Sequence, residues 1–251
     1  MALHPAPHAL YPLQHEKQST PPGCWLVPVA VGQYLVFKLT ALDVWLEDSH
    51  YRLGGFVGAG SWWLETFSHR WVKWAVIATV CAVWTRILGS RWRSSWRENR
   101  IQWQAVGIAL LLAPAAVATM KHFSDRPCPW DLQRYGGKLI DVSILSFSTS
   151  GATGQCFPAG HASTGFSLFA FTLLWLGRDK KKAKIAWWTA FTIGLALGWG
   201  QQLRGAHFLS HTLWSGWICW ATCLVVYRLT IRRGQTNPPK LSRCWNSRMA
   251  K

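Results

Sequence analysis

Six apolar stretches of about 15–20 residues, close to the length that crosses a bilayer, dominate the 251-residue chain. They are Trp25–Leu42, Val72–Leu88, Trp103–Met120, Ala162–Leu176, Ile185–Trp199 and Thr212–Val226. A helix needs about 20 residues to cross roughly 30 Å of hydrocarbon. A soluble protein of this length can bury one or two such helices, but not six. The sequence therefore predicts an all-α, polytopic membrane protein with six transmembrane helices.

Composition agrees with this class. The chain has 19 Trp and only 15% charged residues, and Trp is enriched where a bilayer meets water. The net charge of +17 would also suit nucleic acid, but no zinc-ligand spacing or RNA-recognition signature accompanies it. The positive charge falls between the apolar stretches instead. We therefore expect no nucleic-acid partner, and we expect membrane lipids and an anionic substrate.

The basic residues also predict the orientation of the helices. Seventeen Lys and Arg lie in Arg86–Arg100, Arg178–Lys184 and Arg228–Lys251, which share one side if six helices alternate. The opposite loops, Asp43–Trp71 and Lys121–His161, hold six, together with seven of the ten acidic residues. Positively charged loops stay in the cytoplasm. Both termini are therefore predicted to be cytoplasmic in a bacterial inner membrane, and the opposite loops periplasmic.

This topology gives a simple domain organisation. Residues 1–23 are predicted to form a disordered cytoplasmic tail, 24–230 the six-helix membrane domain, and 231–251 a basic cytoplasmic tail. The first periplasmic loop places Trp45, Trp62 and Trp63 among glycines and polar residues. That mixture is typical of a helix lying in the membrane interface, and equally of an ordinary loop with a few aromatic residues.

Three polar segments stand at the periplasmic ends of the apolar stretches: Lys121–Asp131, Gly154–Ser163 and Gln201–His211. Ionisable residues grouped at a membrane boundary are costly and indicate a functional site. In the second segment, a Pro-Ala-Gly-His turn that opens a helix would place His161 beside free backbone N–H groups, which bind anions. In the third, the spacing of Arg204, His207 and His211 would put them on one face of a helix.

The residue types in these segments suit phosphoryl chemistry. Arg and Lys can hold phosphate oxygens, while His acts as nucleophile or general acid. A metal held by His207 and His211 is the alternative, but no third ligand is evident and the nearby Arg residues would repel a cation. Taken alone, Lys121 is typical of a snorkelling lysine and His122 of an interfacial side chain.

The three segments resemble the motifs of the type-2 phosphatidic acid phosphatase superfamily, which also includes the vanadium haloperoxidases. Those motifs are Lys-x6-Arg-Pro, Pro-Ser-Gly-His and Ser-Arg-x5-His-x3-Asp, and membrane members have six helices. Here Arg126-Pro127 ends the first motif, Pro158-Ala159-Gly160-His161 forms the second, and Gly205-Ala206-His207 lies in the third. The resemblance covers about Trp103–Trp220.

The sequence departs from the family pattern at four positions. The family Lys falls at Thr119, the Ser at Ala159, the Arg at Gln201 and the Asp at His211. Lys121 and Arg204 are nearby cations that can replace two of these residues.

The resemblance also implies a role for each residue. His207 attacks phosphorus to form a phosphohistidine and is oriented by His211, while His161 protonates the leaving lipid oxygen. Charge in the transition state is stabilised by Arg126, Arg204, Lys121 and the amide of Gly160. The resemblance implies no metal and no other cofactor.

The expected function is therefore that of a lipid phosphate phosphatase. Candidate substrates are undecaprenyl pyrophosphate, phosphatidylglycerophosphate, phosphatidate and lipid A phosphate. A phosphotransferase would use the same site, and the departures from the motifs also leave open a catalytically silent membrane scaffold or transporter.

The positions of the seven cysteines predict one disulfide. Cys128 and Cys156 are the two that face the periplasm, where thiols oxidise, and each lies beside a motif. If both motifs bind one phosphate, the two cysteines lie close together and a bridge between them closes the loop of residues 128–156. Cys24 and Cys244 are expected to stay reduced on the cytoplasmic side.

Overall fold

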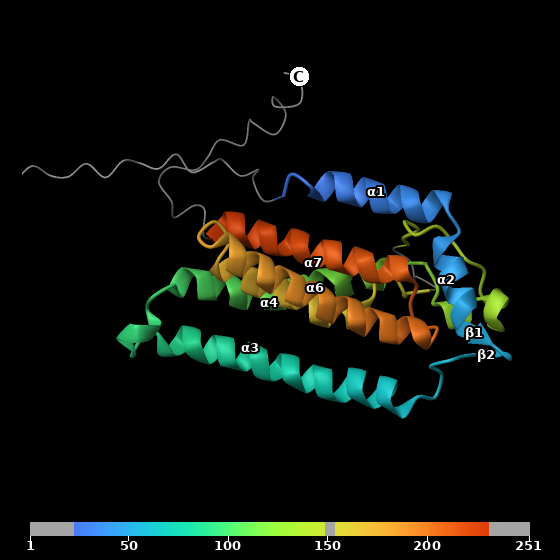
Figure 1. Cartoon of the computed structure of the whole chain (residues 1–251), viewed down its shortest axis with the longest axis horizontal. Coiled ribbons are helices and arrows are strands. Elements are labelled where there is room, and N and C mark those ends of the chain that lie inside the picture. The colour runs from blue at the N-terminus through green and yellow to red at the C-terminus, as the bar shows by residue number, and fades with distance from the viewer. Residues whose placement is uncertain (1–22, 149–153, 231–251) are drawn as a thin grey trace, which may run out of the picture.

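The computed structural model describes residues 23–148 and 154–230, so the two predicted tails lie outside it apart from Gly23. The protein is a bundle of helices with one two-stranded hairpin (Figure 1). The long elements are α1 (Leu26–Leu39), α3 (Val72–Gly89), α4 (Arg100–Phe123), α5 (Gly160–Phe166) continued by the 3-10 helix η5 (Ser167–Leu174), α6 (Lys180–Leu203) and α7 (Leu209–Thr230). The short ones are α2 (Leu42–His50), β1 (Tyr51–Arg52), β2 (Gly55–Phe56), the π-helix η1 (Trp63–Trp71) and the 3-10 turns η2 (Ser94–Trp96), η3 (Pro129–Asp131) and η4 (Gln133–Tyr135).

The predicted helical class is confirmed, and every apolar stretch contains a helix. Within the described residues, α4 and α7 are long and apolar enough to cross a membrane. The pair α1 and α2, bent by 65°, makes a third candidate, and Trp74–Gly89 is a shorter apolar helix. Six membrane crossings therefore remain a prediction.

The main core lies where α4, α5, η5, α6 and α7 meet. Its buried side chains include Leu110, Phe166, Phe169 and Leu173. Small residues let the helices approach closely: a Cβ on Gly165 would lie 2.7 Å from the backbone of Gly194. Such close approach is characteristic of helices that pack in membranes.

The fourth apolar stretch differs from the single α-helix that we expect there. It begins as the seven-residue α5 and continues as the eight-residue η5. A 3-10 helix rises about 2.0 Å per residue, against about 1.5 Å in an α-helix. This conformation lengthens a stretch that would otherwise be short for a membrane crossing.

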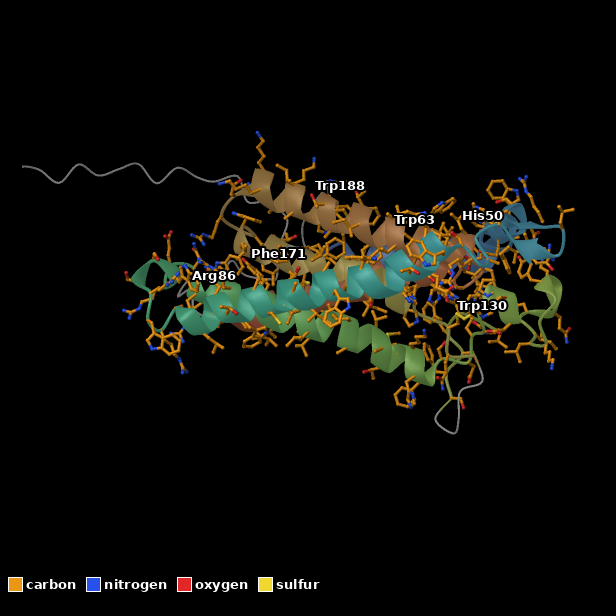
Figure 2. All side chains as sticks on the ribbon, turned by 90° about the horizontal axis from the view of Figure 1, so that it is seen from below. His50, Trp63, Arg86, Trp130, Phe171 and Trp188 are labelled. Carbon is orange, nitrogen blue, oxygen red and sulfur yellow. A yellow bond between two sulfur atoms is a disulfide. The ribbon has the colours of Figure 1, made fainter. Side chains whose placement is uncertain are left out.

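The bundle has two chemically different ends. At one end Arg178 hydrogen-bonds Asn99, and Gly23 approaches the guanidinium of Arg228, so the basic loops and both ends of the described chain lie together. At the other end are α2, the hairpin and the segments 124–148 and 154–158 (Figure 1). Figure 2 shows Arg86 toward the first end and Trp130 at the second.

The segment between α1 and α3 contains two short helices, α2 and η1. Helix α2 packs against the bundle through an acidic face, because Asp43 and Glu47 are its buried residues. Trp45, in the same helix, points outward and is 67% exposed. Trp62 is 62% exposed and Trp63 is 70% exposed. The loop therefore covers the end of the bundle with buried carboxylates inside and indole rings outside.

Candidate active site

Backbone hydrogen bonds join the first and second motifs. Gln155 donates its N–H to the carbonyl of Ser124 at 2.8 Å, and Cys156 donates to the carbonyl of Arg126 at 3.0 Å. The structure also links Cys128 and Cys156 by a disulfide, the pairing predicted from the sequence. Arg126 is thus fixed next to the strand-like segment that leads into the second motif.

Cys24 does not match its prediction. It is disulfide-bonded, so the expected reduced thiol is wrong for this position. The state of a thiol depends on which sulfur approaches it in space, and the sequence around Cys24 does not encode that. Cys81, Cys219 and Cys223 are free.

The third motif lies in a turn between α6 and α7, and not on a continuous helix. Helix α6 ends at Leu203 and α7 begins at Leu209. Gly205 has φ +72°, a left-handed conformation that ends the helical path, and a Cβ there would lie 2.3 Å from the ring of Phe56. The prediction that Arg204, His207 and His211 share one helical face is therefore wrong.

The second and third motifs are bonded directly to each other. Ala159 donates its N–H to the carbonyl of His211 at 3.1 Å. The hydroxyl of Ser215 lies 2.9 Å from the carbonyl oxygens of both residues. The segment before His161 is thereby held against the first turns of α7.

These contacts place the rings of His161 and His207 opposite each other, with an interplanar angle of 55°. Their ring centroids are 6.3 Å apart. A nucleophile and a general acid act on the same phosphoryl group from opposite sides, and the two imidazoles lie on neighbouring segments that the motifs bring together. The ammonium of Lys121 lies beside the same position, 4.0 Å from where a Cβ on Gly160 would be. Lys121 therefore reaches the second motif from the end of α4.

His207 is buried, with an exposed fraction of 3%. Burial lowers the pKa of His207 well below its usual value of 6.5, and the charges of Lys121 and His161 lower it further. A hydrogen bond with the backbone of Cys156 acts in the opposite direction. The imidazole is consequently neutral at ordinary pH, the form in which it can act as a nucleophile.

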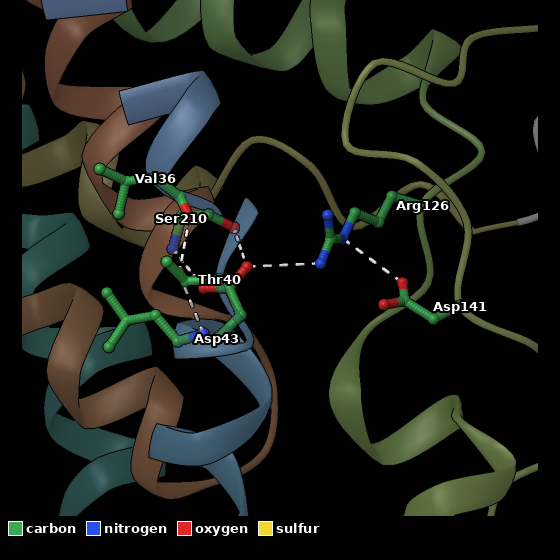
Figure 3. Close-up of polar contacts among 7 residues, drawn as sticks. Val36, Thr40, Asp43, Arg126, Asp141 and Ser210 are labelled. Atoms are coloured by element: carbon green, nitrogen blue, oxygen red, sulfur yellow. Dashed lines mark hydrogen bonds and ion pairs between the residues drawn. The ribbon is translucent and has the colours of Figure 1, made fainter. Parts of the chain in front are cut away.

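Arg126 is held by carboxylates on two sides (Figure 3). Its Nη2 donates to Oδ2 of Asp43 at 3.3 Å, and its Nε lies 3.6 Å from Oδ1 of Asp141. The guanidinium carbon is 5.0 Å from the centroid of the Phe208 ring, the residue after His207. The side chain is 9% exposed, so Arg126 is fixed between these carboxylates and the third motif.

His211 occupies a largely aromatic environment. Its ring is 5.5 Å from Phe157, 5.4 Å from Phe208 and 5.8 Å from His207, all edge-on. It is fully buried, and neither ring nitrogen has a hydrogen-bond partner within the described residues. His211 therefore makes no direct hydrogen bond to His207 within the described residues, and its predicted orienting role stays a proposal.

Arg204 points elsewhere. Its guanidinium donates to Oε1 of Gln201 at 3.1 Å and lies 3.9 Å from Oε1 of Glu65. These contacts direct it toward η1, on the far side of the turn at Gly205. A role for Arg204 in binding phosphate stays a prediction.

The structure also brings together a potential metal-ligand set. One atom from each of Cys156, His207 and His211 lies within 4.8 Å of the others. The sulfur of Cys156 is bonded to Cys128 and is not a thiolate, which is the form that binds metals. Lys121 and Arg126 add positive charge beside these ligands. These three side chains and the two neighbouring cations therefore suit a bound anion better than a metal cation.

The three motifs do not include Asp43 or Asp141. Asp43 directly follows an apolar stretch and is 4% exposed in the structure. Its position after that stretch is the one available signal, because a carboxylate there needs a buried partner.

Comparisons with known proteins agree with this geometry. The family profile described as PAP2 superfamily matches residues 102–235, more than half of the chain. The chain is also 27% identical over 190 residues to a protein named lipid A 4'-phosphatase from Francisella tularensis subsp. novicida (strain U112), an alignment that covers 74% of this chain and 82% of the relative. No solved structure matches significantly. The predicted resemblance is confirmed, and the chain belongs to the PAP2 superfamily of type-2 phosphatidic acid phosphatases.

Proposed function

We propose that this lipid phosphatase removes a phosphate group from a lipid phosphate at the periplasmic face of the inner membrane, through a phosphohistidine on His207. The observation that carries the proposal is the pair of facing rings of His161 and His207, 6.3 Å apart, with Lys121 beside them. Arg126 adds a second cation, which lies against the ring of Phe208 and acts on His211. A nucleophile, a general acid and two cations form a complete phosphoryl-transfer site.

The first step forms a bond between His207 and phosphorus. Nδ1 of His207 lies 3.4 Å from the sulfur of Cys156, so Nε2 is the attacking atom. As the N–P bond forms, the bond from phosphorus to the lipid oxygen breaks, and His161 gives its proton to that oxygen. Lys121 and Arg126 stabilise the charge that builds on the equatorial oxygens.

The second step returns His207 to its starting state. His161, now neutral, takes a proton from water as the water oxygen attacks phosphorus. The N–P bond breaks and inorganic phosphate leaves. One residue thus serves as acid in the first step and as base in the second.

The substrate that we propose is a lipid A phosphate. The supporting observation is the relative named lipid A 4'-phosphatase, which aligns over most of both chains. The outer loop also fits a lipid substrate, because Trp45, Trp62 and Trp63 are exposed at the end of the bundle that holds the site.

We propose six membrane crossings with both termini in the cytoplasm. The two ends of the bundle support this orientation. The hydrogen bond between Asn99 and Arg178 joins two basic loops at the end opposite to the motifs. This arrangement puts the positive loops in the cytoplasm and the site outside.

A phosphate-release assay over purified lipid phosphates tests the proposal. Lipid A, phosphatidate, phosphatidylglycerophosphate and undecaprenyl pyrophosphate are each presented in detergent to the wild type, His207→Ala and Lys138→Ala. We expect release from lipid A, a loss on the order of 10³-fold in His207→Ala, and no change in Lys138→Ala. Release from none of the lipids by folded protein, or transfer of the label to another lipid without free phosphate, would show that the proposed hydrolysis is wrong.

A further inference from the structure

Asp43, which the phosphoryl-transfer steps do not use, lies at the centre of a buried hydrogen-bond network. Its Oδ1 accepts the backbone N–H of Ser210 at 2.9 Å, and its Oδ2 accepts the Ser210 hydroxyl and Nη2 of Arg126 (Figure 3). One buried carboxylate therefore joins helix α2 to the first motif and to the first turn of α7.

The bend between α1 and α2 places this carboxylate. At the end of α1, the hydroxyl of Thr40 donates to the carbonyl of Val36 at 2.6 Å and accepts the N–H of Leu42 at 3.4 Å. The chain then turns by 65° into α2. Asp43, the second residue of α2, consequently faces inward toward α7 (Figure 3).

The third motif of this chain lacks the carboxylate of the family pattern. The family pattern has an Asp four residues after the nucleophilic His, and this chain has His211 there. Asp43 lies outside the segment that matches the family, which begins at residue 102. The N-terminal helices thus bring a carboxylate to a site whose own third motif lacks one.

We propose that Asp43 is a positioning residue for phosphoryl transfer, which holds Arg126 and the start of α7 in the geometry required by the transition state. This inference rests on the proposed function. A guanidinium has five N–H groups, and Asp43 takes one of the two on Nη2. Among the described residues, Nη1 has no hydrogen-bond acceptor, so both of its N–H groups are left for phosphate oxygens. Asp43 therefore orders the side chain without consuming its capacity to bind phosphate.

The bonds to Ser210 extend the same effect to the nucleophile. Ser210 is three residues after His207, and its N–H is one of the free donors at the start of α7. A carboxylate that accepts this N–H caps the helix and fixes the turn that carries His207. Arg126 and His207 are thereby positioned by the same side chain.

The ratio of orthovanadate affinity to inorganic phosphate affinity measures this positioning. Vanadate adopts the five-coordinate geometry of the transition state and requires His207 and Arg126 in place, whereas phosphate requires mainly positive charge. Removal of a nearby negative charge strengthens the binding of both anions, so that contribution largely cancels in the ratio. Both dissociation constants are measured on purified protein in detergent by equilibrium dialysis.

Asp43→Asn retains the shape of the side chain and an acceptor for Ser210 but loses the charge. We expect the vanadate-to-phosphate ratio to fall about tenfold, because the gain from preorganised groups is lost. Asp48→Asn is the matched control: it lies on the same helix and pairs with Arg134 at the surface, so its ratio should stay that of the wild type. Ser210→Ala, which removes one bond to Asp43, should lower the ratio about threefold.

The outcomes separate the inference from the proposed function. A wild-type ratio in Asp43→Asn, or in Ser210→Ala if Asp43→Asn does not fold, overturns the positioning role and leaves the phosphatase intact. Failure of the wild type to bind either anion overturns the proposed phosphoryl site itself. A fall in the ratio in both Asp43→Asn and Asp48→Asn assigns the effect to α2 in general and also overturns the inference.

Discussion

The histidines of the site differ in their surroundings, and those surroundings decide their protonation. Burial and the charges of Lys121 and His161 keep the pKa of His207 below 6.5. His207 must be neutral to attack phosphorus, so its contribution to kcat/KM persists below pH 6.5 and is lost only as the pH falls through the lowered pKa. The nucleophile is therefore ready without a base to deprotonate it.

Lys121→Met tests this electrostatic account. The substitution removes a positive charge beside His207, so the pKa of His207 rises and the acid limb of the kcat/KM profile moves to higher pH. Ionisation of the substrate is the same in both enzymes and drops out of the comparison. Lys138→Met, in the outer loop, should leave the limb in place. An acid limb at the same pH in Lys121→Met and in the wild type would contradict the account.

His211 permits a test by restoration of the family residue. His211→Asp places a carboxylate near Arg126 and His207, where it can stabilise the imidazolium that develops. We expect His211→Asp to retain measurable phosphate release, and His211→Ala to lose most of it, by about tenfold or more. Full activity of His211→Ala would show that residue 211 does not assist His207.

The sequence predicted much of the site, because local motifs carry it. His161 lies opposite His207, Arg126 lies against Phe208, and Lys121 reaches Gly160 although it is two residues from the family position. Asp43 could not be placed in this way, since its partner Ser210 is 167 positions away. Long-range pairs of this kind depend on how the helices pack, and that packing cannot be recognised from the motifs of one sequence.

At the scale of elements, apolar stretches predicted where helices lie but not their detail. The continuation of α5 as the 3-10 helix η5 and the break at Gly205 both escaped prediction. Hydrophobicity does not distinguish an α-helix from a 3-10 helix, and the i, i+3, i+7 spacing at Arg204 suggested a helix that the turn interrupts. Hydrophobicity also does not predict which face of α2 is buried, because the buried residues of this helix are acidic.

The disulfide between Cys128 and Cys156 should stabilise the site as a unit. It closes a loop with a sequence separation of 28 residues, which typically stabilises a fold by about 3–4 kcal/mol. Cys128→Ser and Cys156→Ser should each lower the thermal unfolding temperature by the same amount. Both should also lower phosphate release, because Arg126 is no longer held against the second motif.

Mass spectrometry of the alkylated protein checks the bond itself. In a Cys24→Ser background, so that the bond of Cys24 does not contribute, non-reduced protein should leave residues 128 and 156 unlabelled, and reduction should expose both. Equal labelling of these cysteines with and without reductant would rule out the bridge.

At the scale of the whole molecule, the two ends of the bundle predict a topology. A reporter fused after Lys251 or within Arg178–Lys184 should behave as cytoplasmic, and one within Gly136–Leu145 as periplasmic, since basic loops remain inside. Impermeant labels applied to intact cells provide an independent measurement. If such a label reaches an engineered cysteine in Arg178–Lys184 but not one in Gly136–Leu145, the orientation is inverted.

The most direct test of the account is detection of phosphate on His207. Purified protein is mixed with labelled lipid A, quenched in alkali to preserve phosphohistidine, and digested for mass spectrometry. We predict a modified peptide that contains His207 in the wild type and none in His207→Ala; His161→Ala, which lacks both the acid of the first step and the base of the second, should form it more slowly than the wild type. Turnover of the lipid with no phosphate on His207 in either the wild type or His161→Ala would contradict the account, and phosphate on His211 would assign the nucleophile to the other histidine.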